Sequence, residues 1–254
     1  MAGFAACLMG CSTIQTAGIV GQDSLRFPIV GMAADTTVSE GGLVVKATPN
    51  LSKTPDEYTN AIQGGYVHSW MISLHRNFRL SLAGGVSGYY ARNTLIGVFD
   101  GTEIQRRELN GFGFTCQFKP ALFVGNRESR FMLAGNLTED WEFGDYRDFR
   151  QTFESLNANP YTSKIRTDYS PDGVTFSGSV NAGYVYAMED DTAMSVELGA
   201  GFISPSGTDI FTSTLSVYST TLSYTGRHIW VWLTGDYVND FSSGISMGMG
   251  LRIR

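Results

Sequence analysis

The sequence has little charge and no long apolar run. Only 17% of its 254 residues are charged, against roughly 25% in ordinary soluble domains. The longest unbroken apolar segments, such as Ile229–Leu233, are far shorter than the roughly 20 residues that a spanning helix needs. A helical membrane protein is therefore excluded. The net charge of −6 argues against a nucleic-acid partner.

Cysteine and histidine are also scarce, with three of each. The cysteines are an odd number without the spacing of a disulfide framework, and the histidines are too scattered to form a metal site. We therefore expect neither a metal nor a cofactor. His75 and His228 fall in predicted short turns and His68 in mid-strand, so a nucleophile in a long outer loop would lack its base. We expect no enzyme.

The abundant residues are those of strands and turns, with 30 glycines, 16 phenylalanines and 12 tyrosines. Predicted connections alternate between short and long. The short turns are His75–Asn77, Gly125–Ser129, Glu189–Asp191 and Gly226–Arg227. The longer polar loops are Ala91–Leu109, Asp145–Gly173 and Pro205–Ile210. This alternation is typical of a transmembrane β-barrel with short periplasmic turns and long outer loops.

The predicted fold class is all-β: a transmembrane antiparallel up-and-down β-barrel of about ten strands, in a range of roughly 8 to 12. The strands are expected at 41–48, 61–74, 78–90, 110–124, 130–144, 174–188, 192–204, 211–225, 228–238 and 243–254. An even number of strands brings both ends of the barrel to the periplasmic side.

Side chains alternate along these segments with a period of two, as they do on a strand. In the last segment, Ile245, Met247 and Met249 share one face, whereas Ser246 and Gly248 share the other. A soluble ligand-binding barrel would also alternate, but its outward polar face would carry charge. Here the polar face is mostly Gly, Ser, Thr and Asn, which favours a crowded lumen and an exterior that faces lipid.

Aromatic residues gather near the predicted strand ends, where Tyr and Trp favour membrane interfaces. The periplasmic set is Phe78, Phe131, Tyr184, Tyr186 and Trp230, and the outer set is Tyr89, Tyr90, Trp141, Phe143 and Tyr237. The alternative is the ordinary preference of aromatic residues for strands.

The N-terminus carries a possible export signal. Residues 1–11, MAGFAACLMGC, end in Leu8-Met9-Gly10-Cys11, which resembles the lipobox of bacterial lipoprotein signal peptides. The resemblance implies acylation of Cys11, although no Lys or Arg precedes the apolar run; a start further upstream, or a chance match, is the alternative. Residues 12–40 are interpreted as a periplasmic lead-in or tether. Alternatively, Phe27–Met32 joins the first strand or plugs the barrel.

Residues 41–254 resemble small bacterial outer-membrane barrels in architecture. The last strand is similar to the C-terminal signal of such barrels, with apolar residues at alternate positions, although it ends in Arg254 instead of an aromatic residue. The resemblance implies a place in the bacterial outer membrane. Outer-membrane lipid and other envelope proteins are the expected partners.

Five charged residues are predicted to face the lumen: Arg79, Lys119, Arg130, Glu197 and Arg252. They could form a basic constriction that selects anions. The default interpretation is an ion-pair cluster that fills and braces a narrow barrel, since unpaired buried charges are costly.

The loop Asp145–Gly173 mixes aromatic residues with both charge signs. A contact surface is predicted at Tyr146, Arg147, Phe149, Arg150, Tyr161 and Arg166, because aromatic and arginine side chains dominate interface hot spots. The alternative is that the loop folds inward and caps the barrel.

We therefore expect a non-enzymatic barrel, acting as a narrow passive pore or a surface platform. The alternatives are a lipid-anchored subunit of an envelope assembly and a hydrolase at the barrel rim.

Overall fold

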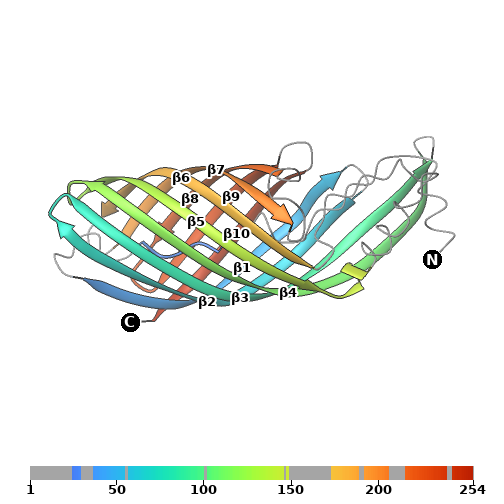
Figure 1. The fold of residues 1–254 in the computed structure, drawn as a ribbon, viewed down its shortest axis with the longest axis horizontal. Helices are drawn as coiled ribbons and strands as arrows, with labels where there is room; N and C mark the ends of the chain where they lie inside the picture. Colours follow the sequence, from blue (N-terminus) through green and yellow to red (C-terminus); the bar gives the residue numbers. More distant parts are fainter. Residues whose placement is uncertain are drawn as a thin grey trace.

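The computed structural model describes residues 25–29, 37–54, 57–99, 102–145, 147–148, 173–188, 192–205, 215–238 and 242–253. These residues form ten strands, drawn in Figure 1. The strands are β1 (Val38–Thr54), β2 (Glu57–His75), β3 (Phe78–Phe99), β4 (Thr102–Gly125), β5 (Ser129–Phe143), β6 (Val174–Met188), β7 (Thr192–Pro205), β8 (Leu215–Thr225), β9 (Ile229–Val238) and β10 (Ser242–Ile253).

The ten strands close into an all-antiparallel barrel in which each strand pairs with its neighbours in the sequence and β10 returns to β1. The closing seam runs from Gly41 opposite Ile253 to Ala47 opposite Met247. Within the barrel wall, closure gives every strand two hydrogen-bonded neighbours, as a sheet that spans hydrocarbon requires. The predicted fold class and strand number are confirmed. Among the described residues there is no helix with the length and apolar character to cross a membrane.

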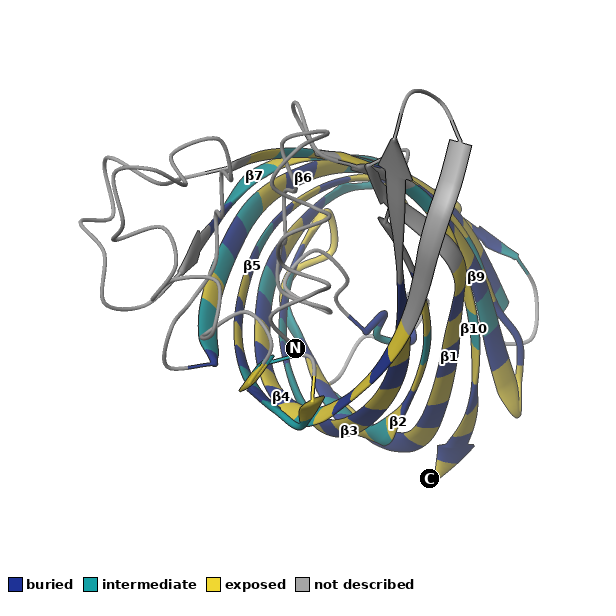
Figure 2. Ribbon diagram, turned by 90° about the vertical axis from the view of Figure 1, so that its right-hand side faces the viewer, coloured by how far each residue is buried: buried dark blue, intermediate teal, exposed yellow. Residues whose placement is uncertain are grey.

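The barrel is apolar outside and mostly polar inside. Figure 2, a view into the barrel, shows buried and exposed residues alternating along each strand. Phe114, Val180 and Leu198 are 48%, 61% and 61% exposed, whereas buried Thr115, Asn181 and Glu197 precede or follow them on the opposite face. An apolar exterior on this scale is unfavourable in water and favourable in hydrocarbon. The predicted alternation is confirmed.

One of the predicted loops is wrong, because the strands continue through it. The segment Ala91–Leu109 was expected as a polar loop, but β3 and β4 pair throughout it, with Asn93 opposite Leu109 and Leu95 opposite Arg107. Likewise β1 and β2 extend beyond the predicted end at residue 48, up to the pair of Thr54 with Glu57. The sequence signal fails here because a hairpin outside the bilayer needs no apolar face. Figure 1 shows the β3–β4 hairpin projecting far beyond the other strands.

The short turns at the opposite end are confirmed where they are described. In the turn after β4, the side-chain oxygen of Asn126 accepts hydrogen bonds from the backbone N–H groups of Glu128 and Ser129, at 3.0 and 2.7 Å. Gly125 precedes it with φ of 151°, a conformation that favours glycine. Its N–H donates to the carbonyl oxygen of Asn77 at 3.0 Å, which joins two neighbouring turns.

Two residues of the predicted aromatic belts face the lumen instead. Trp230 is 1% exposed and Tyr89 is 6% exposed, so these two assignments are wrong. Trp230 and Trp232 lie over the glycines of the neighbouring strand. A Cβ atom at Gly250 would come within 2.2 Å of the Trp230 ring, and one at Gly248 within 2.1 Å of the Trp232 ring. The glycines therefore make room for two large rings inside a narrow barrel.

Most of the remaining belt residues do face outward. Phe78, Phe131, Tyr184, Tyr186, Tyr90 and Tyr237 are exposed. Trp141 and Phe143 are half-buried because they stack on neighbouring rings. The ring centres of Trp141 and Phe114 are 5.0 Å apart, and those of Phe143 and Phe112 are 5.9 Å apart.

Gly250→Ala should destabilise the barrel by about 1–3 kcal/mol, because the added methyl group would overlap Trp230 and overpack the lumen. The matched control is Gly235→Ala on β9, where a Cβ atom would meet nothing within 4 Å. Urea unfolding of protein refolded into phospholipid vesicles measures both. Equal stability of the two variants would contradict the proposed packing.

Candidate functional site in the barrel lumen

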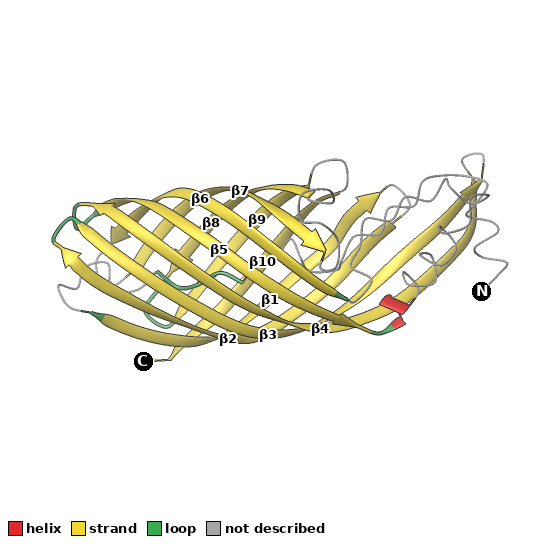
Figure 3. Ribbon diagram, viewed as in Figure 1, coloured by secondary structure: helices red, strands yellow, loops and turns green. Residues whose placement is uncertain are grey.

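The segment Leu25–Ile29 lies inside the barrel, where Figure 3 draws it as a loop surrounded by strands. Barrel side chains bind its backbone. Gln117 Nε2 donates to the carbonyl oxygen of Leu25 at 2.9 Å, and Trp230 Nε1 donates to that of Arg26 at 3.1 Å. The N–H of Ile29 donates to Thr225 Oγ1 at 3.2 Å. This is the plug alternative that the sequence left open for Phe27–Met32, of which residues 27–29 are among those described.

The apolar residues of the segment each pack into an apolar cluster of the lumen. Leu25, 1% exposed, packs with Val44, Val67, Trp230 and Trp232, and Phe27 lies against the same cluster. Ile29 belongs to a second cluster built by β2, β4, β5, β6 and β7: Met71, Ala121, Phe123, Met132, Ala134, Val185, Ala187 and Ala193. The interior thus has apolar sites that match Leu25 and Ile29.

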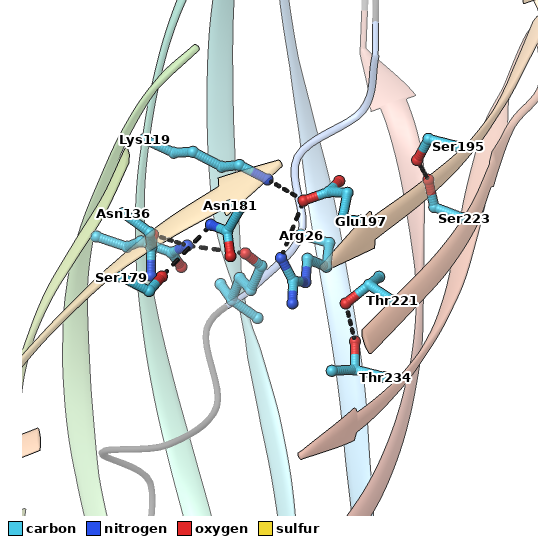
Figure 4. A network of polar contacts seen from close by, with 12 residues as sticks. Arg26, Lys119, Asn136, Ser179, Asn181, Ser195, Glu197, Thr221, Ser223 and Thr234 are labelled. Carbon is cyan, nitrogen blue, oxygen red and sulfur yellow. Dashed lines mark hydrogen bonds and ion pairs between the residues drawn. The ribbon is translucent and has the colours of Figure 1, made fainter. Parts of the chain in front are cut away.

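Between these two residues, Arg26 joins a buried charge triad. Its Nη1 atom lies 3.3 Å from Glu197 Oε2, and Lys119 Nζ lies 2.9 Å from the same oxygen. Figure 4 shows the two cations converging on Glu197 from the plug and from β4. All three side chains are buried. One carboxylate therefore fixes the plug to the wall and neutralises part of the positive charge.

Uncharged polar side chains connect the wall strands around the triad. Gln117 Nε2 also donates to Asn136 Oδ1 at 2.8 Å. Gln63 Nε2 donates to Ser87 Oγ at 2.8 Å and to Thr115 Oγ1 at 3.4 Å. These bonds cross from β2 to β5, and they satisfy polar groups that are buried in the lumen.

The five predicted lumen residues all face inward, but they do not form one cluster. Lys119 and Glu197 come together, as the bracing alternative required. Arg252 lies apart with Glu40, at 2.7 Å between Nη2 and Oε2. Arg79 and Arg130 lie near the periplasmic turns.

Sequence reasoning missed Arg26 and Glu40, which supply a cation and a carboxylate to these sites. Arg26 lies outside every predicted strand, so no alternation pattern could place it. Glu40 immediately precedes the predicted start of the barrel. The sequence did contain a signal for Glu40. When the period of two in the first strand is extended backwards, Glu40 falls on the same face as Gly42 and Val44.

The predicted contact surface in the loop after β5 is described only at Arg147. This side chain is half-buried, and its guanidinium lies 5.9 Å from the centre of the Phe143 ring, so it packs back against the end of β5. The other five predicted contact residues lie outside the described residues: Tyr146, Phe149, Arg150, Tyr161 and Arg166. Cys11 lies outside them as well, and its acylation stays a prediction.

A separate polar cluster lies on the outer face near the periplasmic rim. Ser39 Oγ is 2.8 Å from His68 Nε2, and the hydroxyl oxygen of Tyr66 is 3.1 Å from His68 Nδ1. The ring of Trp70 lies 4.4 Å from that of His68, centre to centre. The sequence placed His68 in mid-strand but did not bring Ser39 to it, because that contact is made between β1 and β2.

The described residues contain no group of three His, Cys, Asp or Glu side chains that could hold a metal ion. The contacts of the lumen site are ion pairs and hydrogen bonds of amides and hydroxyls. Its geometry can hold a peptide segment in place and fix charges within the barrel.

No family model matches the chain, and no curated protein matches it. Among solved structures, the β-domain of the Bordetella autotransporter BrkA aligns over 87% of this chain and 100% of that one, with 8% identity and a TM-score of 0.46. An outer membrane channel from Pseudomonas putida F1 covers 91% and 98%, with 8% identity and a TM-score of 0.42. The translocator domain of the Neisseria meningitidis autotransporter NalP covers 92% and 91%, with 11% identity and a TM-score of 0.42.

The class of protein follows from the barrel itself. Closed antiparallel barrels with an even strand number, an apolar outer band and short turns at one end are those of the bacterial outer membrane. This protein is an outer-membrane β-barrel. The predicted location therefore agrees with the observed structure, and Arg26, Lys119 and Glu197 lie within the lumen of a membrane protein.

Glu197→Gln should destabilise the barrel by roughly 3 kcal/mol, because it leaves Arg26 and Lys119 buried without their shared counter-ion. The control is Glu108→Gln, which removes an exposed carboxylate 3.4 Å from Arg92 and should cost less than about 1 kcal/mol. Urea unfolding in phospholipid vesicles compares the two. Similar losses in both variants would refute the idea that the triad is a buried anchor.

Proposed function

We propose that the protein is a non-enzymatic outer-membrane platform whose lumen is closed by its own residues 25–29. The observation that carries this proposal is the plug itself, which is held by Gln117, Trp230 and Thr225 and by the ion pair of Arg26 with Glu197. An open passive pore needs a continuous aqueous path, and here a peptide segment occupies the interior of a ten-stranded barrel.

The contacts of the plug favour the closed state. Full burial of a leucine or isoleucine side chain contributes roughly 1.5–3 kcal/mol, and both Leu25 and Ile29 are buried. The charge of Arg26 would be costly in the lumen without Glu197. Since several such contacts must break together, spontaneous opening of the lumen should be rare.

The outer end of the barrel supplies the platform. A tilted strand needs about 9–11 residues to cross a bilayer, whereas β3 and β4 have 22 and 24 residues. About half of this hairpin therefore stands beyond the membrane, together with the end of the shorter β1–β2 hairpin. Paired strands form a firm surface, and we propose other envelope proteins as its partners.

Outer-membrane lipid is the second proposed partner. A groove of about 440 Å³ opens on the outside of β1, β2 and β3, lined in part by Ile62, Tyr90 and Arg92. Apolar Ile62 and Tyr90 lie on the membrane side, and Arg92 and Asn60 lie one step further out. The groove thus spans the level at which an acyl chain meets a polar headgroup.

The wild-type protein should be silent in planar bilayers, whereas Leu25→Asn combined with Ile29→Asn should give discrete conductance steps. The two amides would lie unpaired in the apolar clusters, so the plug should leave them. Glu197→Gln, which releases Arg26, should raise the frequency of opening as well.

The control is Thr138→Ala, a lumen-facing change on β5 that removes a small buried side chain and should stay silent. All variants are first checked for the folded, heat-modifiable band on a gel. Steady conductance of the wild-type protein would overturn the platform proposal in favour of the narrow passive pore.

A second candidate function, a hydrolase at the membrane surface, is favoured by the Ser39, His68 and Tyr66 cluster. Acyl transfer by serine requires a base within hydrogen-bond reach and a group that orients the base. Histidine with its proton on Nδ1 would donate to Tyr66 and accept from Ser39. At the periplasmic rim, the substrate would be an acyl ester of an inner-leaflet lipid.

A fluorophosphonate probe tests this second candidate by forming a bond from phosphorus to Ser39 Oγ with loss of fluoride. If the cluster is catalytic, the folded protein should be labelled, and Ser39→Ala and His68→Ala should both abolish labelling. Ser216→Ala, at another exposed position on β8, should leave it unchanged. Absence of labelling, or labelling that survives Ser39→Ala, removes the hydrolase.

A further inference from the structure

Two buried arginines lie near each other at the periplasmic end of the lumen. Arg79, near the start of β3, is 0% exposed, and Arg130, near the start of β5, is 1% exposed. Each arginine stands opposite an apolar residue on one of its two neighbouring strands: Arg79 opposite Phe123 and Arg130 opposite Val185. Arg79 is close enough to Arg130 to repel its charge.

Arg130 differs from Arg26 and Arg252 in its partners. Within the described part of the chain, none of its guanidinium nitrogens Nε, Nη1 and Nη2 has a hydrogen-bond partner, although all three are buried. In contrast, Arg26 has Glu197 and Arg252 has Glu40. Buried polar groups are almost always hydrogen-bonded, and a buried cation without a partner costs several kcal/mol. A second positive charge nearby increases that cost.

We propose that Arg130, assisted by the charge of Arg79, binds a small oxyanion of the phosphate or carboxylate class. The planar guanidinium group offers a fork of N–H donors that matches two oxygens of such an anion. Phe123, Met132 and Val185 keep the surroundings apolar, which strengthens the attraction. The anion would satisfy the donors of Arg130 and screen the two cations from each other.

The position of the pair indicates where the anion comes from. Arg130 directly follows Ser129, the first residue of β5, and Arg79 lies two residues after Asn77 in the turn before β3. Both are thus close to the periplasmic mouth. Because the side chains face the inside of a closed barrel, a free anion from the periplasm fits better than the headgroup of a lipid outside the wall. This inference is independent of whether the barrel conducts.

The test measures the unfolding temperature of the full-length protein, refolded in a zwitterionic detergent, as chloride is replaced by inorganic phosphate at constant ionic strength. Binding to the folded state alone should raise this temperature saturably, by roughly 5 °C at high occupancy. Arg130→Gln should abolish the phosphate response. Arg76→Gln, at an exposed turn position close to Arg79, is the matched control and should retain it.

Two further measurements make the result decisive. Arg130→Lys keeps the charge but loses the fork of donors, so half-saturation should need at least several-fold more phosphate. If Arg130→Gln fails to refold, Arg130→Lys replaces it as the test of phosphate binding. Micelles that contain phosphatidylglycerol, without free phosphate, test the lipid source and should not reproduce the effect. The proposal is overturned by a wild-type protein that shows no saturable response, by an equal response in the Arg130 variants, or by a response to the lipid alone.

Discussion

The need to pair every backbone N–H and C=O group in hydrocarbon is the constraint on which this structure depends. A sheet can meet it only by closing on itself, and here the seam between β1 and β10 completes the circle. Closure then fixes which face of each strand meets lipid. The apolar side chains that would form the core of a soluble protein lie on the outside, and a small interior is left for the polar ones.

Such an interior must be filled, and this chain fills it in two ways. Trp230 and Trp232 extend over the glycines of β10, and Leu25–Ile29 enters the remaining space. Both solutions use close packing, which is also what stabilises a soluble core. The described part of the lumen therefore resembles a small packed core, and this packing is the ground on which we propose a platform and not a pore.

Charge is the second problem of an enclosed lumen. Glu197 holds Lys119 and Arg26, and Glu40 holds Arg252. In each case the carboxylate and a cation come from distant parts of the chain, so these ion pairs also tie the plug and the closing seam in place. Arg130 departs from this arrangement, and a bound anion would give it the counter-charge that Arg26 and Arg252 already have.

The sequence by itself determined the barrel, the number of strands and the inward face of Arg79, Lys119, Arg130, Glu197 and Arg252, because a period of two is a local property that lipid enforces along every strand. It could not determine where the β3–β4 hairpin ends, since alternation loses its apolar signal outside the bilayer. Only the tertiary structure decided that Arg26 meets Glu197, that Trp230 faces inward and that Ser39 reaches His68. Those contacts depend on strand register and on the space left inside a closed barrel. Both are set by several strands together, so no single segment of the sequence can predict them.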